Sequence, residues 1–333
     1  MALTEGTRRT PAVLRVAGRP AWVALAVVVA PFAVGIEVSP TVRYLPFLAS
    51  LVVFGLPHGA ADHLAIARLG GRRPYLAVGA AYLVGGGAYL VAWLVAPDAA
   101  FAGFILLTWY HWGQGDLYFL LAVDGEHLRT RAQRVLALAV RGGIPMVAPL
   151  VAFPDAYRAV ARATVSLFDP AVADAFEPAF QPGFRFALGG GLAALSVLGL
   201  ALGAARADSG WRIDAAETGL LWAYFLVVPP VLAVGLYFCL WHSVRHVVRL
   251  AVLEDGDSAF SGGVPAALAR FGRDALPNTV GALVVLGALA GLSPAGAGLE
   301  SLLGVYLVLL AVLTLPHTLV VTWMDRREGV WTT

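Results

Sequence analysis

Long apolar runs are the feature of this sequence that most constrains its fold. Several uninterrupted runs approach or exceed the ~20 residues that a helix needs to cross a lipid bilayer. Hydrophobic residues make up 59% of the chain and charged residues only 13%, whereas soluble domains carry about one quarter charged residues. The sequence therefore predicts an all-α, polytopic membrane protein folded as one helical bundle.

About eight transmembrane helices are expected, in a single domain over residues 21–325. The expected spans are 21–38, 44–69, 75–96, 99–123, 184–205, 218–250, 276–292 and 299–324. The stretch 218–250 is longer than one crossing needs, and Pro229 and Pro230 are expected to divide it into a short lead and a main helix at about 231–250. The segment 135–153 is apolar but contains Arg141, glycines and two prolines, so we interpret it as a broken span or a re-entrant piece. Residues 155–182 resemble an interfacial helix followed by a loop, and residues 206–217 a polar connection.

The ends of the chain and its basic loops predict the orientation in the membrane. Residues 1–20 are basic and show no obvious signal-cleavage site, so they are expected to be a cytoplasmic lead, and residues 326–333 a short polar tail. Arginines gather in these two ends and in the loops 68–73 and 129–134. Because basic loops stay on the cytoplasmic side, the eight-span scheme predicts a multi-pass protein of the cell membrane.

Charge and cysteine content exclude several kinds of site. The net charge of +2 gives no support for a nucleic-acid partner. The single cysteine, Cys239, excludes an internal disulfide and any metal cage built from cysteines. A chemical site must therefore come from the other polar residues within the apolar segments.

Six of the seven histidines lie in four apolar segments. These segments are FGLPHGAADH (54–63), TWYHWGQGD (108–116), LWHSVRH (240–246) and LPHTLVVTWMD (315–325). Ionisable side chains are costly in a bilayer and need partners inside the protein. His58, His111 and His242 each lie roughly 11 to 15 residues into their spans, which puts them at a similar depth. Under the eight-span scheme these helices and that of His317 run in the same direction, so the histidines can form one metal centre.

Spacing selects a candidate set of four metal ligands. His242 and His246 are four residues apart and project from one face of a helix. With His58 and His111 they form the predicted set. His63, five residues after His58, and His317 are expected in an outer shell around the metal ligands.

Carboxylate and amide side chains lie close in sequence to the predicted ligands. Asp62 shares a helix face with His58 and can accept the second ring N–H of an imidazole. Thr108, Gln114 and Asp116 are similar candidates around His111. Arg141 is expected to pair with an acidic group such as Asp62 or Asp116.

Each of these residues also has a purely structural alternative. A histidine inside a membrane can serve as a hydrogen-bonded packing residue between helices. The aromatic residues next to the histidines can belong to the core or face lipid, but collectively they suit an apolar ligand pocket. The candidate substrate contacts are Trp109, Tyr110, Trp112, Tyr237, Phe238 and Trp241.

At these motifs the chain resembles the Brp/Blh family of membrane β-carotene 15,15′-dioxygenases, which supply retinal to microbial rhodopsins. The resemblance covers about residues 54–325 and four motifs in the same order. It implies a helical membrane enzyme that holds one non-haem Fe(II) and cleaves the central double bond of β-carotene with O₂ to give two retinal molecules. The family's iron-binding histidines correspond to His58, His111, His242 and His246.

A reaction of this kind fits the predicted site, because it needs no general acid or base beyond the metal ligands. A carotenoid dissolves in the lipid, so it is expected to pass between helices into a tunnel. We expect small and aromatic side chains of the second, fourth and seventh spans to line this tunnel. The substrate range, the oligomeric state, a docked rhodopsin and the identity of the metal are left open by the residues.

Two other classes remain open. In an ion-coupled transporter, intramembrane His and Asp residues together with Arg141 could form a proton relay, and the proline-broken segments resemble the discontinuous helices of transporters. A haem protein or a di-iron oxidase is another possibility, although such sites generally need different ligand sets. Bleaching of a β-carotene-producing strain would distinguish the dioxygenase from these classes.

Overall fold

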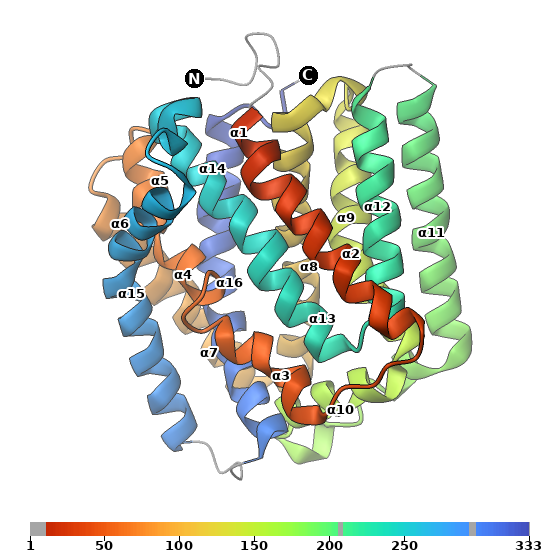
Figure 1. Ribbon diagram of the computed structural model, residues 1–333. Coiled ribbons are helices and arrows are strands. Elements are labelled where there is room, and N and C mark those ends of the chain that lie inside the picture. The colour runs from red at the N-terminus through yellow and green to blue at the C-terminus, as the bar shows by residue number, and fades with distance from the viewer. Residues whose placement is uncertain (1–10, 206–208, 293–297, 333) are drawn as a thin grey trace.

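Long helices run side by side in this protein and form one bundle (Figure 1). The computed structural model describes residues 11–205, 209–292 and 298–332, and within these ranges all regular structure is helical. Seven helices of the described chain are long and apolar enough to cross a membrane: Pro11–Ala33, Pro74–Val95, Arg131–Ala152, Pro182–Ala204, Pro230–Leu253, Val264–Gly291 and Leu299–Arg327. The prediction of an all-α polytopic membrane bundle is confirmed.

Several spans consist of shorter helices that follow one another. In chain order the elements are α1 (Pro11–Val13), η1 (Leu14–Gly18), α2 (Arg19–Ala33), α3 (Pro40–Ala49), α4 (Gly55–Ala60), α5 (Asp62–Arg68), α6 (Pro74–Ala81), η2 (Tyr82–Gly86), α7 (Gly87–Val95), α8 (Pro97–Asp124), η3 (Gly125–His127), α9 (Arg131–Ala152), α10 (Pro154–Val165), η4 (Pro170–Val172), η5 (Glu177–Phe180), α11 (Pro182–Ala204), α12 (Gly210–Val227), α13 (Pro230–Tyr237), η6 (Phe238–His242), α14 (Ser243–Asp255), η7 (Gly256–Phe260), α15 (Val264–Leu292) and α16 (Leu299–Arg327). The π-helical turns η2 and η6 interrupt otherwise continuous spans, and such turns are frequent at functional sites.

The expectation of one helix over 44–69 is wrong, because the chain breaks into α3, α4 and α5. Phe54 directly precedes α4 with a positive φ of 58°, a backbone conformation that is uncommon outside glycine and that a helix cannot include. Gly55 fits there because a β-carbon would come within 2.5 Å of the Ser50 carbonyl oxygen. Pro57 falls in the first turn of α4, where its missing N–H is not needed. After the break, α4 packs against α14, α15 and α16.

Two further segments are more regular than expected. Residues 135–153 belong to the continuous helix α9, so they are neither broken nor re-entrant despite their prolines. The expected connection 206–217 contains the first turns of α12, which packs against α9, α11 and α2. The stretch 218–250 is divided at Pro229, as expected, but the part before the prolines belongs to the full helix α12 and the part after them is the rod α13–η6–α14. Residues 206–208 of the expected connection lie outside the described residues, and its Asp214 and Glu217 are buried inside the bundle.

The histidine-bearing helices α8, α13–α14 and α16 run in the same direction, as expected (Figure 1). The arginine-rich segments meet at one end of the bundle, where α14 and α16 end side by side. Arg68 donates a hydrogen bond to the Leu250 carbonyl at 2.8 Å, and Arg134 donates to the Val330 carbonyl at 2.7 Å. This arrangement agrees with the predicted placement of these arginines on one side of the membrane.

The ends of the bundle differ slightly from the expected boundaries. Of the expected lead at 1–20, residues 1–10 lie outside the described residues, and the remainder already forms α1, η1 and the start of α2. Helix α16 continues into the expected tail at 326–333, of which the last residue lies outside the described residues. The expected interfacial segment at 155–182 contains α10, η4 and η5 at one end of the bundle (Figure 1).

Candidate metal centre

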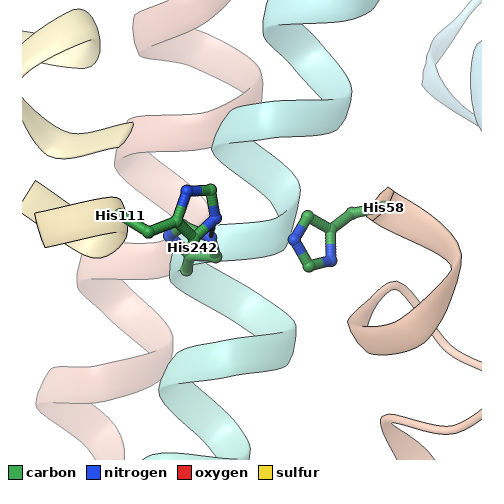
Figure 2. A group of neighbouring side chains, drawn as sticks. All are labelled: His58, His111 and His242. Atoms are coloured by element: carbon green, nitrogen blue, oxygen red, sulfur yellow. Dashed lines mark hydrogen bonds between the residues drawn. The ribbon is translucent and has the colours of Figure 1, made fainter. Parts of the chain in front are cut away.

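Five of the six histidines from the apolar segments converge inside the bundle. The His111 ring centroid lies 4.7 Å from those of His242 and His317. The His58 ring centroid lies 4.9 Å from that of His317 and 5.5 Å from that of His246. All five side chains are buried, with at most 6% of the surface exposed. Figure 2 shows His58, His111 and His242 projecting towards one another from three separate elements.

The closest pair of ring nitrogens has the spacing of two ligands on one metal. His111 Nε2 and His242 Nε2 lie 3.0 Å apart, so these two nitrogens must share either a proton or a cation. Two imidazole nitrogens bound at ~2.1 Å from one ion, at right angles, lie ~3.0 Å apart. A ligand atom of His58 lies within 4.8 Å of both. Three helices therefore present nitrogens that can reach a common ion.

Hydrogen bonds on the outer nitrogens fix the tautomers of two rings. His58 Nδ1 donates to the Gly55 carbonyl, so its Nε2 keeps a free lone pair. His317 Nδ1 donates to Asp62 Oδ1 at 2.8 Å, and Tyr82 donates to Asp62 Oδ2 at 2.9 Å. A carboxylate behind an imidazole orients the ring and raises its basicity towards a metal.

Several ring nitrogens of the cluster have no hydrogen-bond partner, as expected for atoms that bind a metal ion. Buried polar atoms almost always have a hydrogen-bond partner. Within the described residues the following ring nitrogens lack one: His58 Nε2, His111 Nδ1, His242 Nδ1, His246 Nε2 and His317 Nε2. Ligand atoms of Asp62, His246 and His317 also lie within 4.8 Å of one another. The donor set, neutral imidazoles with one carboxylate behind them, fits a transition-metal ion.

The structure places the outer-shell candidates differently from the sequence expectation. Asp62 hydrogen-bonds to His317, not to His58, and His317 itself lies within the cluster. His63 lies apart from it: its ring stacks on Tyr75 at 4.7 Å, and its Nδ1 is 3.2 Å from Asn278 Nδ2. Asp62 and His63 follow His58 closely in sequence, but their side chains contact residues of α16 and α15.

Gln114 and Asp116 join helices through their side chains. Gln114 donates to Asp325 on α16 at 2.9 Å. Asp116 accepts from Arg245 at 2.8 Å and pairs with Arg141 Nε at 3.1 Å. Of the two partners expected for Arg141, the structure selects Asp116.

A cavity of about 640 Å³ opens beside the cluster. His58, His111 and His317 form part of its wall, and Thr108 lines it one helical turn before His111. Most of its other lining residues are apolar. A mainly apolar cavity with a few convergent polar groups is the usual form of a small-ligand site.

Two of the six aromatic candidates line this cavity, Trp112 and Phe238. The other four point elsewhere: Trp109 donates to the Ala139 carbonyl at 2.8 Å, and Trp241 donates to Asp116. Tyr110 and Tyr237 are likewise not in the cavity wall. An aromatic residue that is close to a histidine in sequence need not lie on the same face of the helix.

The spacing of residues along α8 gives a sequence signal for cavity-lining residues that were not predicted. The α8 residues that line the cavity are Phe101, Phe104, Ile105, Thr108, His111 and Trp112. Their spacing of three and four residues is that of one helix face. The face of α8 that carries His111 therefore predicts the contact residues better than its sequence neighbours do.

Fold and site together define an integral membrane protein with a candidate metal centre at the wall of an apolar cavity. The family described as beta-carotene 15,15′-dioxygenase matches residues 49–325, and the chain belongs to this family, as its motifs predicted. It is 49% identical to the probable beta-carotene 15,15′-dioxygenase Blh of Halobacterium salinarum, over 98% of this chain and 97% of that protein. It is 36% identical to the probable beta-carotene 15,15′-dioxygenase Brp of the same species, over 91% and 88%. No solved structure matches the chain.

Proposed function

We propose that this protein cleaves the central double bond of β-carotene with O₂ and forms two molecules of retinal. The observation that carries the proposal is the convergence of five buried imidazoles, of which His58, His111 and His317 line an apolar cavity, in a chain that belongs to the β-carotene 15,15′-dioxygenase family. Each carbon of the cleaved bond receives one oxygen atom, so no proton has to be taken up or released.

We propose Fe(II) as the metal, held by His58, His111, His242 and His246. His317 would contribute a fifth imidazole, because its free Nε2 lies in the same cluster and its ring is oriented by Asp62. Iron held by these imidazoles would supply the reactivity towards dioxygen that protein side chains lack.

The side chains of this protein position the substrate and exclude water. The apolar walls of the cavity hold a polyene beside the histidines, and buried Trp112 and Phe238 cover the rings of His242 and His58. His58 and His317 donate their Nδ1–H groups to the Gly55 carbonyl and the Asp62 carboxylate, which keeps each ring in the tautomer whose Nε2 has a free lone pair. The protein thus provides orientation and a dry cavity, while the redox chemistry belongs to the cofactor.

Loss of colour in a carotenoid-producing host tests this function. Expression in a strain that makes β-carotene, with iron and oxygen supplied, should remove the orange pigment, and retinal should appear at two molecules per molecule of β-carotene lost. Purified protein treated with an iron chelator should lose the activity and regain it with Fe(II). A membrane fraction that folds and binds iron but leaves β-carotene intact would rule the function out.

Asp62→Asn should lower the affinity for the metal by about 10- to 100-fold. An amide cannot stabilise the His317 imidazole as a carboxylate does, because it carries no charge. Titration of Fe(II) or Co(II) into the metal-free protein measures this affinity directly. Asp274→Asn on the exposed part of α15 is the matched control, and an unchanged affinity in Asp62→Asn would remove His317 from the ligand set.

We further propose that the protein resides in the cell membrane and passes retinal to a microbial rhodopsin. The apolar spans support a membrane location, and retinal is the product that such a receptor requires. The transporter alternative has less support, since Asp62 and Asp116 belong to different hydrogen-bond networks and do not form one relay.

A further inference from the structure

The cavity beside the histidines reaches the protein surface between two helical spans. Residues that both line the cavity and are exposed lie in two stripes: Tyr75, Gly79, Leu83 and Gly87 on α6–η2–α7, and Pro277, Asn278, Gly281 and Val285 on α15. Within each stripe the residues recur every three or four positions, so each stripe is one face of a helix. The two faces border a single opening, which we call the α6–α15 opening.

Both spans that border this opening face the lipid. Only 11% of the apolar window is buried in Pro74–Val95, and the same share is buried in Val264–Gly291. Helix α15 lies at the edge of the bundle (Figure 1). A ligand dissolved in the bilayer therefore meets the α6–α15 opening without passing through water.

Glycines leave the α6–α15 opening free of side chains. A β-carbon added at Gly79, Gly87 or Gly281 would meet no atom within 4 Å. By contrast, a β-carbon at Gly86 would come within 3.3 Å of Val312 on α16. Gly86 is thus needed for helix packing, whereas the three open glycines are not.

The inner end of the cavity carries buried polar atoms that lack partners. His58 Nε2, His317 Nε2 and Thr108 Oγ1 all belong to cavity-lining residues and have no hydrogen-bond partner within the described chain. These residues are at most 7% exposed. The cavity thus connects the lipid to the histidine cluster.

One end of the opening is closed by a chain of contacts. Asn278 on α15 donates to the Ala60 carbonyl at 2.7 Å and lies next to His63 on α5. His63 in turn stacks on Tyr75 of α6. These contacts hold α6 and α15 at a defined separation without filling the space between them.

We propose that the α6–α15 opening is the portal through which a linear polyene passes from the bilayer to the histidine cluster. This inference rests on the proposed function. It adds the third expected span to the expected route, because the portal lies between the third and seventh expected spans, whereas the second, fourth and seventh were expected to line the tunnel. Small residues at the opening leave room for a long conjugated chain with ring ends.

Bulky side chains at the open glycines test the portal. Gly79→Phe and Gly281→Phe should each lower kcat/KM for β-carotene about tenfold or more, because they slow association. Bound iron and the midpoint of thermal unfolding should stay at the wild-type values, since a β-carbon at either position meets no atom within 4 Å. Gly287→Phe is the matched control: it lies on the same helix, also meets no atom within 4 Å, and is outside the cavity wall.

A second measurement separates this inference from the function itself. The rate at which β-carotene quenches the tryptophan fluorescence of the metal-free protein reports access to the cavity without catalysis. Slower quenching in Gly79→Phe and Gly281→Phe but not in Gly287→Phe supports the portal even if no cleavage occurs. Wild-type quenching and cleavage rates in both variants would overturn it.

Discussion

His111→Ala and His242→Ala should each reduce iron binding and β-carotene cleavage by more than ~100-fold, since loss of an outer hydrogen-bond partner alone costs 10- to 100-fold. Their Nε2 atoms form the closest nitrogen pair in the cluster, so either substitution removes a nitrogen from the centre of the proposed site. Iron per folded chain, measured on purified monodisperse protein, and retinal formation are the two readouts.

His127→Gln is the control for these substitutions. His127 is also buried, but it lies at the end of the bundle and hydrogen-bonds to Asp214, away from the cluster. The variant should retain wild-type iron per folded chain even if its stability falls. Full iron content in His111→Ala or His242→Ala would show that the nitrogen pair shares a proton and not a metal.

The convergence of the histidines could be predicted because helical rise converts sequence position into depth. His58, His111 and His242 were expected in one layer, and their rings do meet. The place of His317 could not be predicted in the same way. The orientation of His317 depends on its hydrogen bond to Asp62, which follows the break between α3 and α4. The positive φ of Phe54 at this break has no recognisable signal in the sequence.

The charged residues inside the bundle were the least predictable part. Glu217 was expected at the end of the polar connection 206–217. In the structure it lies in α12 and is 1% exposed. Only the tertiary fold brings it to the arginines of α9 and α14, which are distant in sequence. Composition alone therefore misjudges polar residues that are paired inside a membrane protein.

Glu217→Ala should destabilise the folded protein by about 3 to 5 kcal/mol, because it removes one of the two carboxylates that pair with the buried guanidinium groups of Arg141 and Arg245. Glu217 binds the side chains of Arg141 and Arg245 and accepts from Trp22 Nε1 at 2.5 Å. Asp116 then remains as the one buried carboxylate in contact with both arginines. The midpoint of thermal unfolding in detergent, followed by the monodisperse fraction in size-exclusion chromatography, measures the effect.

An exposed ion pair provides the comparison for Glu217. Asp155 pairs with Arg158 on α10, but its side chain is 90% exposed, so Asp155→Asn should change stability by no more than about 0.5 kcal/mol. Glu217→Gln should fall between the two, since an amide keeps the shape and one acceptor. In Glu217→Ala, iron should be lost only together with the fold, whereas His111→Ala should lose iron while remaining folded. Equal unfolding midpoints for Glu217→Ala and Asp155→Asn would mean that the arginines do not need this carboxylate.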